Sequence, residues 1–341
     1  MGKTITMAAL AKELGLSESA VSKALNDYPD ISPETKKLVR GKADELGYSP
    51  NLLARNLAKK TSNFVGIVIR DVSSIYGEMF KSLNAVARRS NLNLILYDTS
   101  QSRSIENACV QNLIDSMAMG IVVVPVSEDI SQIRKMTRNH VPVVYLGGKV
   151  RVDSVNYVCS DSTAGAETAL RHLIGQGHRK IVMLCDGKTS NSRSRKIAVY
   201  QKMMRRLGEE EQILYSDAAE SDLAAAGYRL GKELLASGKA FTAVFAVKDT
   251  LAIGALSALK EAGVRVPEQV SVIGYDGIDA SALPLIGLTT VAQPRMEMAE
   301  KVIDILRQHA EEPAAPPEHW LAQPGLIIRG STAACDGSEN H

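Results

Sequence analysis

Four polar residues near the N-terminus are spaced so that they share one face of a predicted helix. They are Glu18, Ser19, Ser22 and Lys23, and residues three and four apart on a helix are neighbours. A lysine ammonium can donate to O6 and N7 of guanine, and a carboxylate can accept from N4 of cytosine. This face could therefore bind base edges in the major groove of DNA. The alternative is an ordinary solvated helix face.

A second group of polar residues follows predicted strands. The predicted strands end at Arg70-Asp71, Asp98, Pro125, Asp161, Lys248-Asp249 and Asp276, and all of these residues except Pro125 are polar. Ligands of open α/β sheets bind beyond the carboxyl ends of the strands, so these residues are candidates for lining a pocket. A carboxylate has two acceptor oxygens, which suits the hydroxyls of a polyol. An acid at this place can instead cap the following helix, and we expect that role for Asp249.

The sequence contains no pattern that indicates catalysis or a metal site. The motifs G-x-G-x-x-G, G-x-x-x-x-G-K-[ST], G-x-S-x-G and H-E-x-x-H are absent. The six histidines are scattered, and the four cysteines include no C-x-x-C pair. We therefore expect no enzymatic activity, no cofactor and no bound metal.

The elements that position the first group are three short helices. Apolar residues recur at helical spacing over 7–14, 18–25 and 33–46, and Thr6, Ser17 and Ser32 are N-cap residues before these segments. Leu38, Val39, Ala43 and Leu46 are expected to face inward on the third helix. A glycine-containing turn between the first two helices predicts a helix-turn-helix domain over residues 1–48.

A short helix after Pro50 and a linker are predicted over residues 49–62. A helix of this length is marginal in water, so it needs a partner, and DNA is a candidate. From Asn63 onward, apolar strands alternate with amphipathic helices, which predicts parallel sheets covered on both faces. The strands are too numerous for one sheet. We therefore predict an effector-binding and dimerisation core over 63–332 with two Rossmann-like lobes: about 63–161 with 293–322, and about 162–292 with 323–332. Residues 333–341 are expected to be a disordered tail.

Charge is distributed unevenly, although the formal net charge is only +2. Residues 1–60 contain ten Lys/Arg and seven Asp/Glu, while the remaining residues contain 30 and 31. A mildly basic small domain joined to a near-neutral large one fits a nucleic-acid-binding protein. The N-terminus has no continuous apolar segment, and no apolar run approaches the ~18 residues of a membrane span. We expect a cytoplasmic protein.

Several motifs in a fixed order resemble the LacI/GalR family of bacterial transcription regulators, over residues ~4 to 332. The motifs are Thr6-Met-Ala-Ala-Leu-Ala11, Leu16-Ser-Glu-Ser-Ala-Val-Ser-Lys-Ala-Leu-Asn26, Leu46-Gly-Tyr-Ser-Pro-Asn51 with Ala54-Arg55, Gly177-His-Arg-Lys-Ile181 and Val272-Ile-Gly-Tyr-Asp276. The resemblance implies a DNA-binding headpiece, a hinge helix, a two-lobed core like periplasmic sugar-binding proteins, and a homodimer on a palindromic operator in double-stranded DNA. The segment Ile69–Ser73 is similar to the maltose-regulon repressor branch.

The resemblance implies a set of DNA contacts. Glu18, Ser19 and Lys23 occupy its base-contacting positions, where lysine replaces the usual arginine. Leu57 matches the hinge leucine that is wedged into the minor groove, although it could instead pack in the headpiece. Lys59 and Lys60 are expected to meet phosphates. The remaining candidate DNA-binding residues are Thr6, Ser17, Ser22, Asn26, Asn51 and Arg55.

The resemblance also implies an effector site. Asp161 and Asp276 match acidic ligand contacts that usually accept sugar hydroxyls, with helix capping as the alternative. Lys196 and Lys248 stand where an arginine and an asparagine are usual. The other candidates are Arg70, Ser74, Tyr76, Arg193 and Arg295. Several cations and few aromatic residues predict an anionic effector, such as a sugar phosphate or sugar acid. Alternatively, the two lysines pair with Asp161 and Asp276.

Two other functional classes compete with a regulator: a Rossmann-type enzyme and a solute-binding protein for transport. Missing catalytic motifs oppose the first. The helix-turn-helix and the missing signal peptide oppose the second. Activator against repressor stays open on the residues alone, and repressor is the choice that the resemblance favours.

Overall fold

The computed structural model describes residues 5–48, 62–72, 74–138, 141–147, 153–187, 190–217 and 222–335. The chain divides into two compact units, Met1–Ser62 and Asn63–His341, which we call the headpiece unit and the core. Both were expected as separate parts of the chain, and each is described by itself. Within the described residues no helix is long and apolar enough to cross a membrane.

The headpiece unit contains three helices at the predicted places: α1 (Met7–Leu14), α2 (Glu18–Leu25) and α3 (Pro33–Leu46). The hydroxyls of Thr6, Ser17 and Ser32 each accept a backbone N–H three residues later, which satisfies one free donor of each first turn. Leu10, Val21, Val39 and neighbouring alanines form the small core. Leu38 was expected in this core but is 58% exposed, because it lies about 100° around α3 from Val39.

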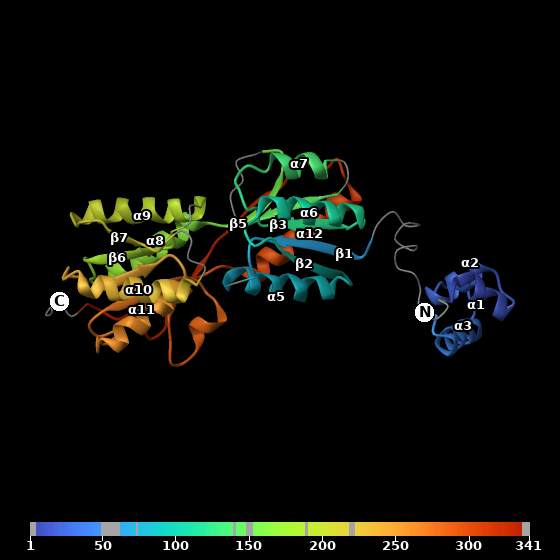
Figure 1. Ribbon diagram of the computed structural model, residues 1–341, viewed down its shortest axis with the longest axis horizontal. Coiled ribbons are helices and arrows are strands. Elements are labelled where there is room, and N and C mark those ends of the chain that lie inside the picture. The colour runs from blue at the N-terminus through green and yellow to red at the C-terminus, as the bar shows by residue number, and fades with distance from the viewer. Residues whose placement is uncertain are drawn as a thin grey trace. The chain divides into compact units, whose positions relative to one another are not determined.

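The first sheet of the core is entirely parallel, with strand order β11-β5-β4-β3-β1-β2. Its strands are β1 (Phe64–Ile69), β2 (Asn93–Asp98), β3 (Gly120–Val123), β4 (Val143–Leu146), β5 (Asn156–Ser160) and β11 (His319–Ala322). One face is covered by α5 (Ser74–Arg89) and α12 (Arg295–Glu311), and the other by α6 (Arg103–Asp115) and α7 (Ser131–Thr137) (Figure 1). Each face encloses its own apolar cluster.

The second sheet has strand order β12-β10-β9-β8-β6-β7. Its strands are β6 (Ile181–Cys185), β7 (Gln212–Tyr215), β8 (Ala243–Ala246), β9 (Ser271–Asp276), β10 (Thr289–Ala292) and β12 (Gly325–Ile327). Helices α8 (Ser162–Gly175) and α9 (Asn191–Leu207) cover one face, and α10 (Leu223–Ala236) and α11 (Asp249–Glu261) cover the other (Figure 1). A short 3-10 helix, η1 (Asp279–Ala282), follows β9.

The fold class predicted from the sequence is confirmed, with corrections at the sheet edges. The strands β7, β11 and β12 were not anticipated, because these runs are only three or four residues long and partly exposed. The second sheet is not wholly parallel, since β12 pairs antiparallel with β10. Two residues connect β11, at the edge of the first sheet, to β12, which joins the edge of the second sheet beside β10.

The sequence analysis predicted that a disordered tail begins at residue 333, and this start is too early. The backbone N–H of Ala333 donates to Ser271 Oγ at 3.0 Å, and that of Cys335 donates to the carbonyl oxygen of Gln176 at 2.7 Å. These hydrogen bonds hold residues 333–335 on the second lobe. Residues 336–341 lie outside the described part of the chain.

Candidate DNA-binding face and candidate effector site

Helix α2 separates its residues into a buried side and an exposed side, as its periodicity predicts. Val21 and Ala24 are buried, while Ser17, Glu18, Ser19 and Asn26 are exposed and Ser22 and Lys23 are half-buried. Glu18 and Ser19 form no hydrogen bond or ion pair with any described residue. Their side chains are thus available for a partner outside the chain.

The remaining side chains of this face have partners within the headpiece. Thr6 and Ser17 act as helix caps, and Asn26 Nδ2 donates to the carbonyl oxygen of Ser22 at 2.8 Å. Lys23 Nζ lies 2.5 Å from Asp30 Oδ2, in the loop between α2 and α3. This hydrogen bond to Asp30 raises the pKa of Lys23 and lowers that of Asp30. Asp30 therefore competes with any outside partner for the ammonium of Lys23.

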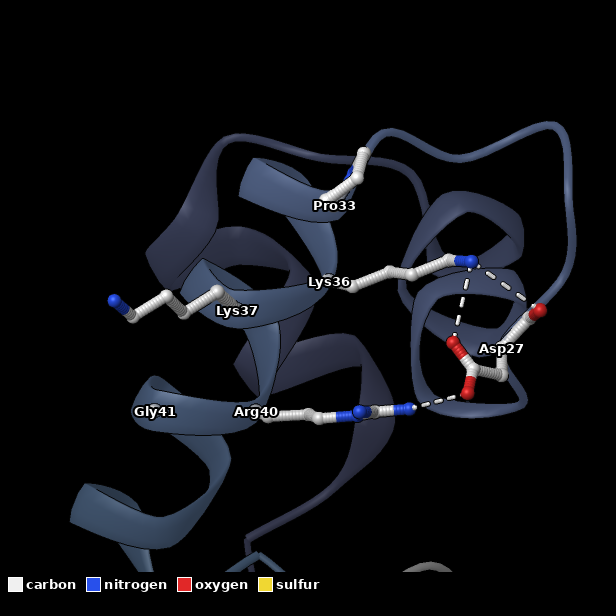
Figure 2. Close-up of a pocket in the computed structure, with 6 residues that line it drawn as sticks. All are labelled: Asp27, Pro33, Lys36, Lys37, Arg40 and Gly41. Atoms are coloured by element: carbon white, nitrogen blue, oxygen red, sulfur yellow. Dashed lines mark hydrogen bonds and ion pairs between the residues drawn. The ribbon is translucent and has the colours of Figure 1, made fainter.

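The loop also carries Asp27, which has φ 64°, a conformation that aspartate tolerates better than most residues. Its carboxylate lies 3.2 Å from Lys36 Nζ and 3.2 Å from Arg40 Nη2, both on α3. These residues line a shallow groove together with Pro33, Lys37 and Gly41, and Lys37 points away from Asp27 (Figure 2). The predicted DNA contacts Asn51, Arg55, Leu57, Lys59 and Lys60 lie outside the described residues.

In the core, the cations of the second lobe gather around a carboxylate that the sequence analysis did not select. Asp186 follows β6, and its Oδ2 lies 3.1 Å from Lys248 Nζ. Arg193 Nη1 donates to the backbone oxygen of Asp186 at 2.5 Å and lies 3.9 Å from its Oδ1. Burial opposes the charge on Lys248, but attraction to Asp186 and Asp276 outweighs it and raises the pKa of Lys248. The position of Asp186 directly after a strand was the signal that could have identified it.

Asp276 and Lys196 form the most deeply buried part of this group. Lys196 Nζ lies 3.3 Å from the ring centroid of Tyr275 and donates to the Val247 oxygen at 2.9 Å. Burial lowers the pKa of Lys196 to about 8 and raises that of Asp276. Asp276 has φ 119°, where strain is expected for a side chain, and Gln293 donates to its Oδ1 at 2.8 Å. Its buried Oδ2 has no hydrogen-bond partner among the described residues.

Two further acids that follow strands, Asp161 and Asp249, accept hydrogen bonds from nearby residues of the second lobe. Asp161 is the N-cap of α8, and its Oδ1 accepts from the N–H groups of Thr163 and Ala164. Asp249 was expected to be an N-cap, which is wrong. It is the first residue of α11, and its carboxylate accepts from Ile278 N at 2.9 Å and Thr290 Oγ1 at 2.5 Å. Asp249 therefore fastens the loop after β9. Neither Lys196 nor Lys248 forms an ion pair with Asp161 among the described residues.

The remaining candidates, Arg70, Ser74, Tyr76 and Arg295, all lie in elements of the first lobe or directly after one. Arg295 donates to the Gly277 oxygen at 2.6 Å and so supports the same loop. Arg70 follows β1 and donates to the hydroxyl of Tyr76, over whose ring it also lies. Ser74 begins α5, and its side chain is outside the described part of the chain.

Two buried polar residues at the carboxyl edge of the first sheet were missed by the sequence analysis. Thr99 is fully buried, and its Oγ1 has no partner among the described residues. Glu106 is 3% exposed and accepts from Val126 N at 2.7 Å. Burial raises the pKa of Glu106, against the attraction of Arg103 and Arg70. Glu106 comes from the first turn of α6, so no rule about strand ends could have selected it.

Comparison with known proteins decides the family. A family described as "Periplasmic binding protein-like domain" matches residues 170–332. The HTH-type transcriptional regulator AscG of Escherichia coli is 31% identical over 304 residues, which is 87% of this chain and 90% of that protein. The chain belongs to the LacI/GalR family of transcriptional regulators.

Solved structures show the same fold. The lac repressor dimer bound to operator and the anti-inducer ONPF matches with a TM-score of 0.85 and 24% identity, over 97% of this chain and 100% of that one. A LacI family regulator from Enterococcus faecalis V583 with bound ribose matches with a TM-score of 0.70 and 25% identity, over 80% and 99%.

As a member of this family the chain is a DNA-binding transcriptional regulator and not an enzyme. The maltose-regulon branch suggested by Ile69–Ser73 is not resolved. Relatives named for several different regulons match at 26% to 31% identity.

Proposed function

We propose that this family member is a dimeric repressor that binds a palindromic operator and is controlled by a small sugar-like effector carrying an anionic group. In the proposal, α2 enters the major groove with Glu18, Ser19 and Lys23 toward the bases. The effector binds at the carboxyl ends of the two core sheets. The operator and the anti-inducer bound by the similar lac repressor, and the ribose bound by the E. faecalis regulator, support these two partner classes.

One observation carries the class of effector. Two buried guanidinium nitrogens, Arg70 Nε and Arg193 Nε, have no hydrogen-bond acceptor among the described residues, and Asp276 Oδ2 has no donor. Leaving such groups unpaired is costly, so a ligand that supplies partners is stabilised. A phosphate or carboxylate suits the two donors, since charge-assisted bonds to guanidinium are strong. A sugar hydroxyl suits the carboxylate oxygen.

Control of DNA binding follows from differential affinity. The two core sheets belong to two lobes, and the chain passes between the lobes three times, after β5, β10 and β11. A ligand that contacts both lobes therefore favours one arrangement of the two lobes. We infer that this arrangement determines whether residues 49–62 support the headpiece on the operator. A ligand shifts that equilibrium only by the ratio of its affinities for the two states.

A thermal-shift screen tests the effector class. Full-length protein is heated with matched pairs of free sugars, sugar phosphates and sugar acids. We expect some phosphorylated or acidic members to raise the Tm and to change operator affinity, while their neutral counterparts do so only weakly. Stabilisation by neutral sugars alone would refute the anionic effector and leave the regulator proposal in place.

Selection of bound sequences from random duplex DNA tests the operator. A palindromic consensus bound by a dimer is expected, with two half-sites related by the two-fold axis of the protein. A non-palindromic consensus, or binding by a monomer, would contradict the proposed assembly.

A further inference from the structure

The loop between α2 and α3 places two carboxylates beside the cations of the headpiece. Asp30 Oδ2 lies 2.5 Å from Lys23 Nζ, which the α2 face offers to DNA. Asp27 bridges Lys36 and Arg40, both on α3, at 3.2 Å each (Figure 2). Both acids are more than half exposed, and DNA could replace Asp30 as the partner of Lys23, the cation on the proposed base-contacting face.

We propose that Asp30 is a specificity-determining residue, which pairs with Lys23 and limits its use to DNA sites that offer a better partner than a carboxylate. The proposal rests on the proposed role of Lys23 in base contact. A guanine supplies two acceptors, O6 and N7, at a fixed place in the groove. On random DNA, the groups that compete with Asp30 for Lys23 are phosphates, which have no fixed place relative to the lysine. The negative charge of Asp30 also repels an approaching phosphate.

The ion pair between Asp30 and Lys23 is expected to affect non-specific DNA binding and operator binding differently. Non-specific binding depends almost entirely on neutralised phosphates, and each additional phosphate contact makes the salt dependence steeper. While Lys23 is held by Asp30, it contributes little to that mode. In the operator complex, Lys23 moves to the base, and Asp30 is left toward solvent, which its exposure permits. Asp30 therefore weakens non-specific binding more than operator binding.

Asp27 provides a matched control within the same loop. Asp27→Asn removes the same charge as Asp30→Asn, but it releases Lys36 and Arg40, which belong to α3 and not to the base-contacting face. A general effect of net charge would appear equally in both variants. An effect that runs through Lys23 would appear only in Asp30→Asn and would vanish once Lys23 is removed.

The experiment compares four variants of the full-length protein: Asp30→Asn, Asp27→Asn, Lys23→Met and the double variant Asp30→Asn with Lys23→Met. Affinity for the selected operator and for scrambled duplex DNA is measured at several salt concentrations. For Asp30→Asn we expect a several-fold gain on scrambled DNA, a smaller gain on operator, and a slope of log K against log salt on scrambled DNA that is steeper by about 0.9.

Three results would overturn the inference: equal changes in Asp30→Asn and Asp27→Asn, an effect of Asp30→Asn that persists in the double variant, or a loss of operator affinity with no gain on scrambled DNA. The last would mean that Asp30 positions Lys23 for the base. A wild-type protein that does not distinguish any operator from scrambled DNA would refute the proposed function, and this inference with it.

Discussion

Lys248 Nζ lies 3.1 Å from Asp186 Oδ2, although 62 positions separate the two residues in the sequence. Strands β6 and β8 are neighbours in the second sheet, and both residues follow the carboxyl ends of these strands. The carboxylate also lies 3.9 Å from Arg193 Nη1. The anionic effector that we propose would therefore compete with Asp186 for the same cations.

Asp186→Asn removes that competitor. We expect affinity for an anionic effector to rise about fivefold, equivalent to ~1 kcal/mol, and affinity for neutral sugars to stay the same. Isothermal titration of both ligand classes measures this. Asp304→Asn, at an exposed site on α12, removes the same charge and should change neither affinity. Weaker binding of the anion to Asp186→Asn would mean that Asp186 orders the cations and does not compete for them.

Lys196 is expected to make the stability of the core change with pH in the alkaline range. Its pKa of about 8 in the fold lies below its ordinary value of 10.5 because the side chain is buried. Between these values the unfolded chain holds a proton that the folded chain has lost, so the free energy of unfolding rises with pH. Relative to Lys196→Met, the wild-type Tm is expected to increase from pH 8 to pH 10. Parallel Tm curves for the two proteins across this range would refute the prediction.

Asp249 has the opposite effect in acid. Its pKa is about 6 in the fold against an ordinary 3.8, because burial disfavours the charged carboxylate. Between pH 4 and 6 the folded protein holds the proton that the unfolded chain releases, so this group lowers stability as pH rises, and the full loss remains above pH 6. Asp249→Asn should flatten this part of the stability curve, measured by urea unfolding at each pH. A slope unchanged by the substitution would assign the dependence to other acids.

The contact between α10 and α11 depends on glycine. A Cβ added at Gly254 would lie 2.0 Å from the Ala224 carbonyl oxygen, which is backbone and cannot move aside as a side chain can. Gly254→Ala is therefore expected to cost about 3 kcal/mol in the free energy of unfolding. At Gly175, on α8, an added Cβ meets nothing within 4 Å. Gly175→Ala should be neutral or stabilising by up to ~1 kcal/mol. Equal stability of the two variants in urea would show that the helices can separate without cost.

Glu18 is exposed and forms no hydrogen bond or ion pair with a described residue, so its carboxylate is available to a partner outside the chain. Glu18→Ala is expected to change the order in which operator variants are preferred, since a carboxylate accepts from cytosine N4 and repels other arrangements. Glu34→Ala, also exposed but on α3, should leave that order unchanged. Competition binding with a panel of single-base operator variants measures both. If Glu18→Ala left the order of preference among the operator variants unaltered, Glu18 would have no role in base recognition.

The sequence by itself determined the features that depend on neighbours along the chain. N-cap hydroxyls and apolar spacing located α1, α2 and α3, and the alternation of apolar strands with amphipathic helices predicted the two lobes. These signals are local, because capping and amphipathicity act within a few residues. The family motifs, found in the same order along this chain, predicted that the protein is a transcription regulator.

Only the tertiary structure decided which polar groups meet. The partner of Lys248 is Asp186 and not Asp161 or Asp276, and Asp249 fastens the loop after β9 instead of capping its helix. Glu106 reaches the sheet edge from α6, and β12 pairs antiparallel at the end of the second sheet. Such choices depend on side-chain directions and strand order across long stretches of chain, where a shift of a few ångströms changes which charge is nearest.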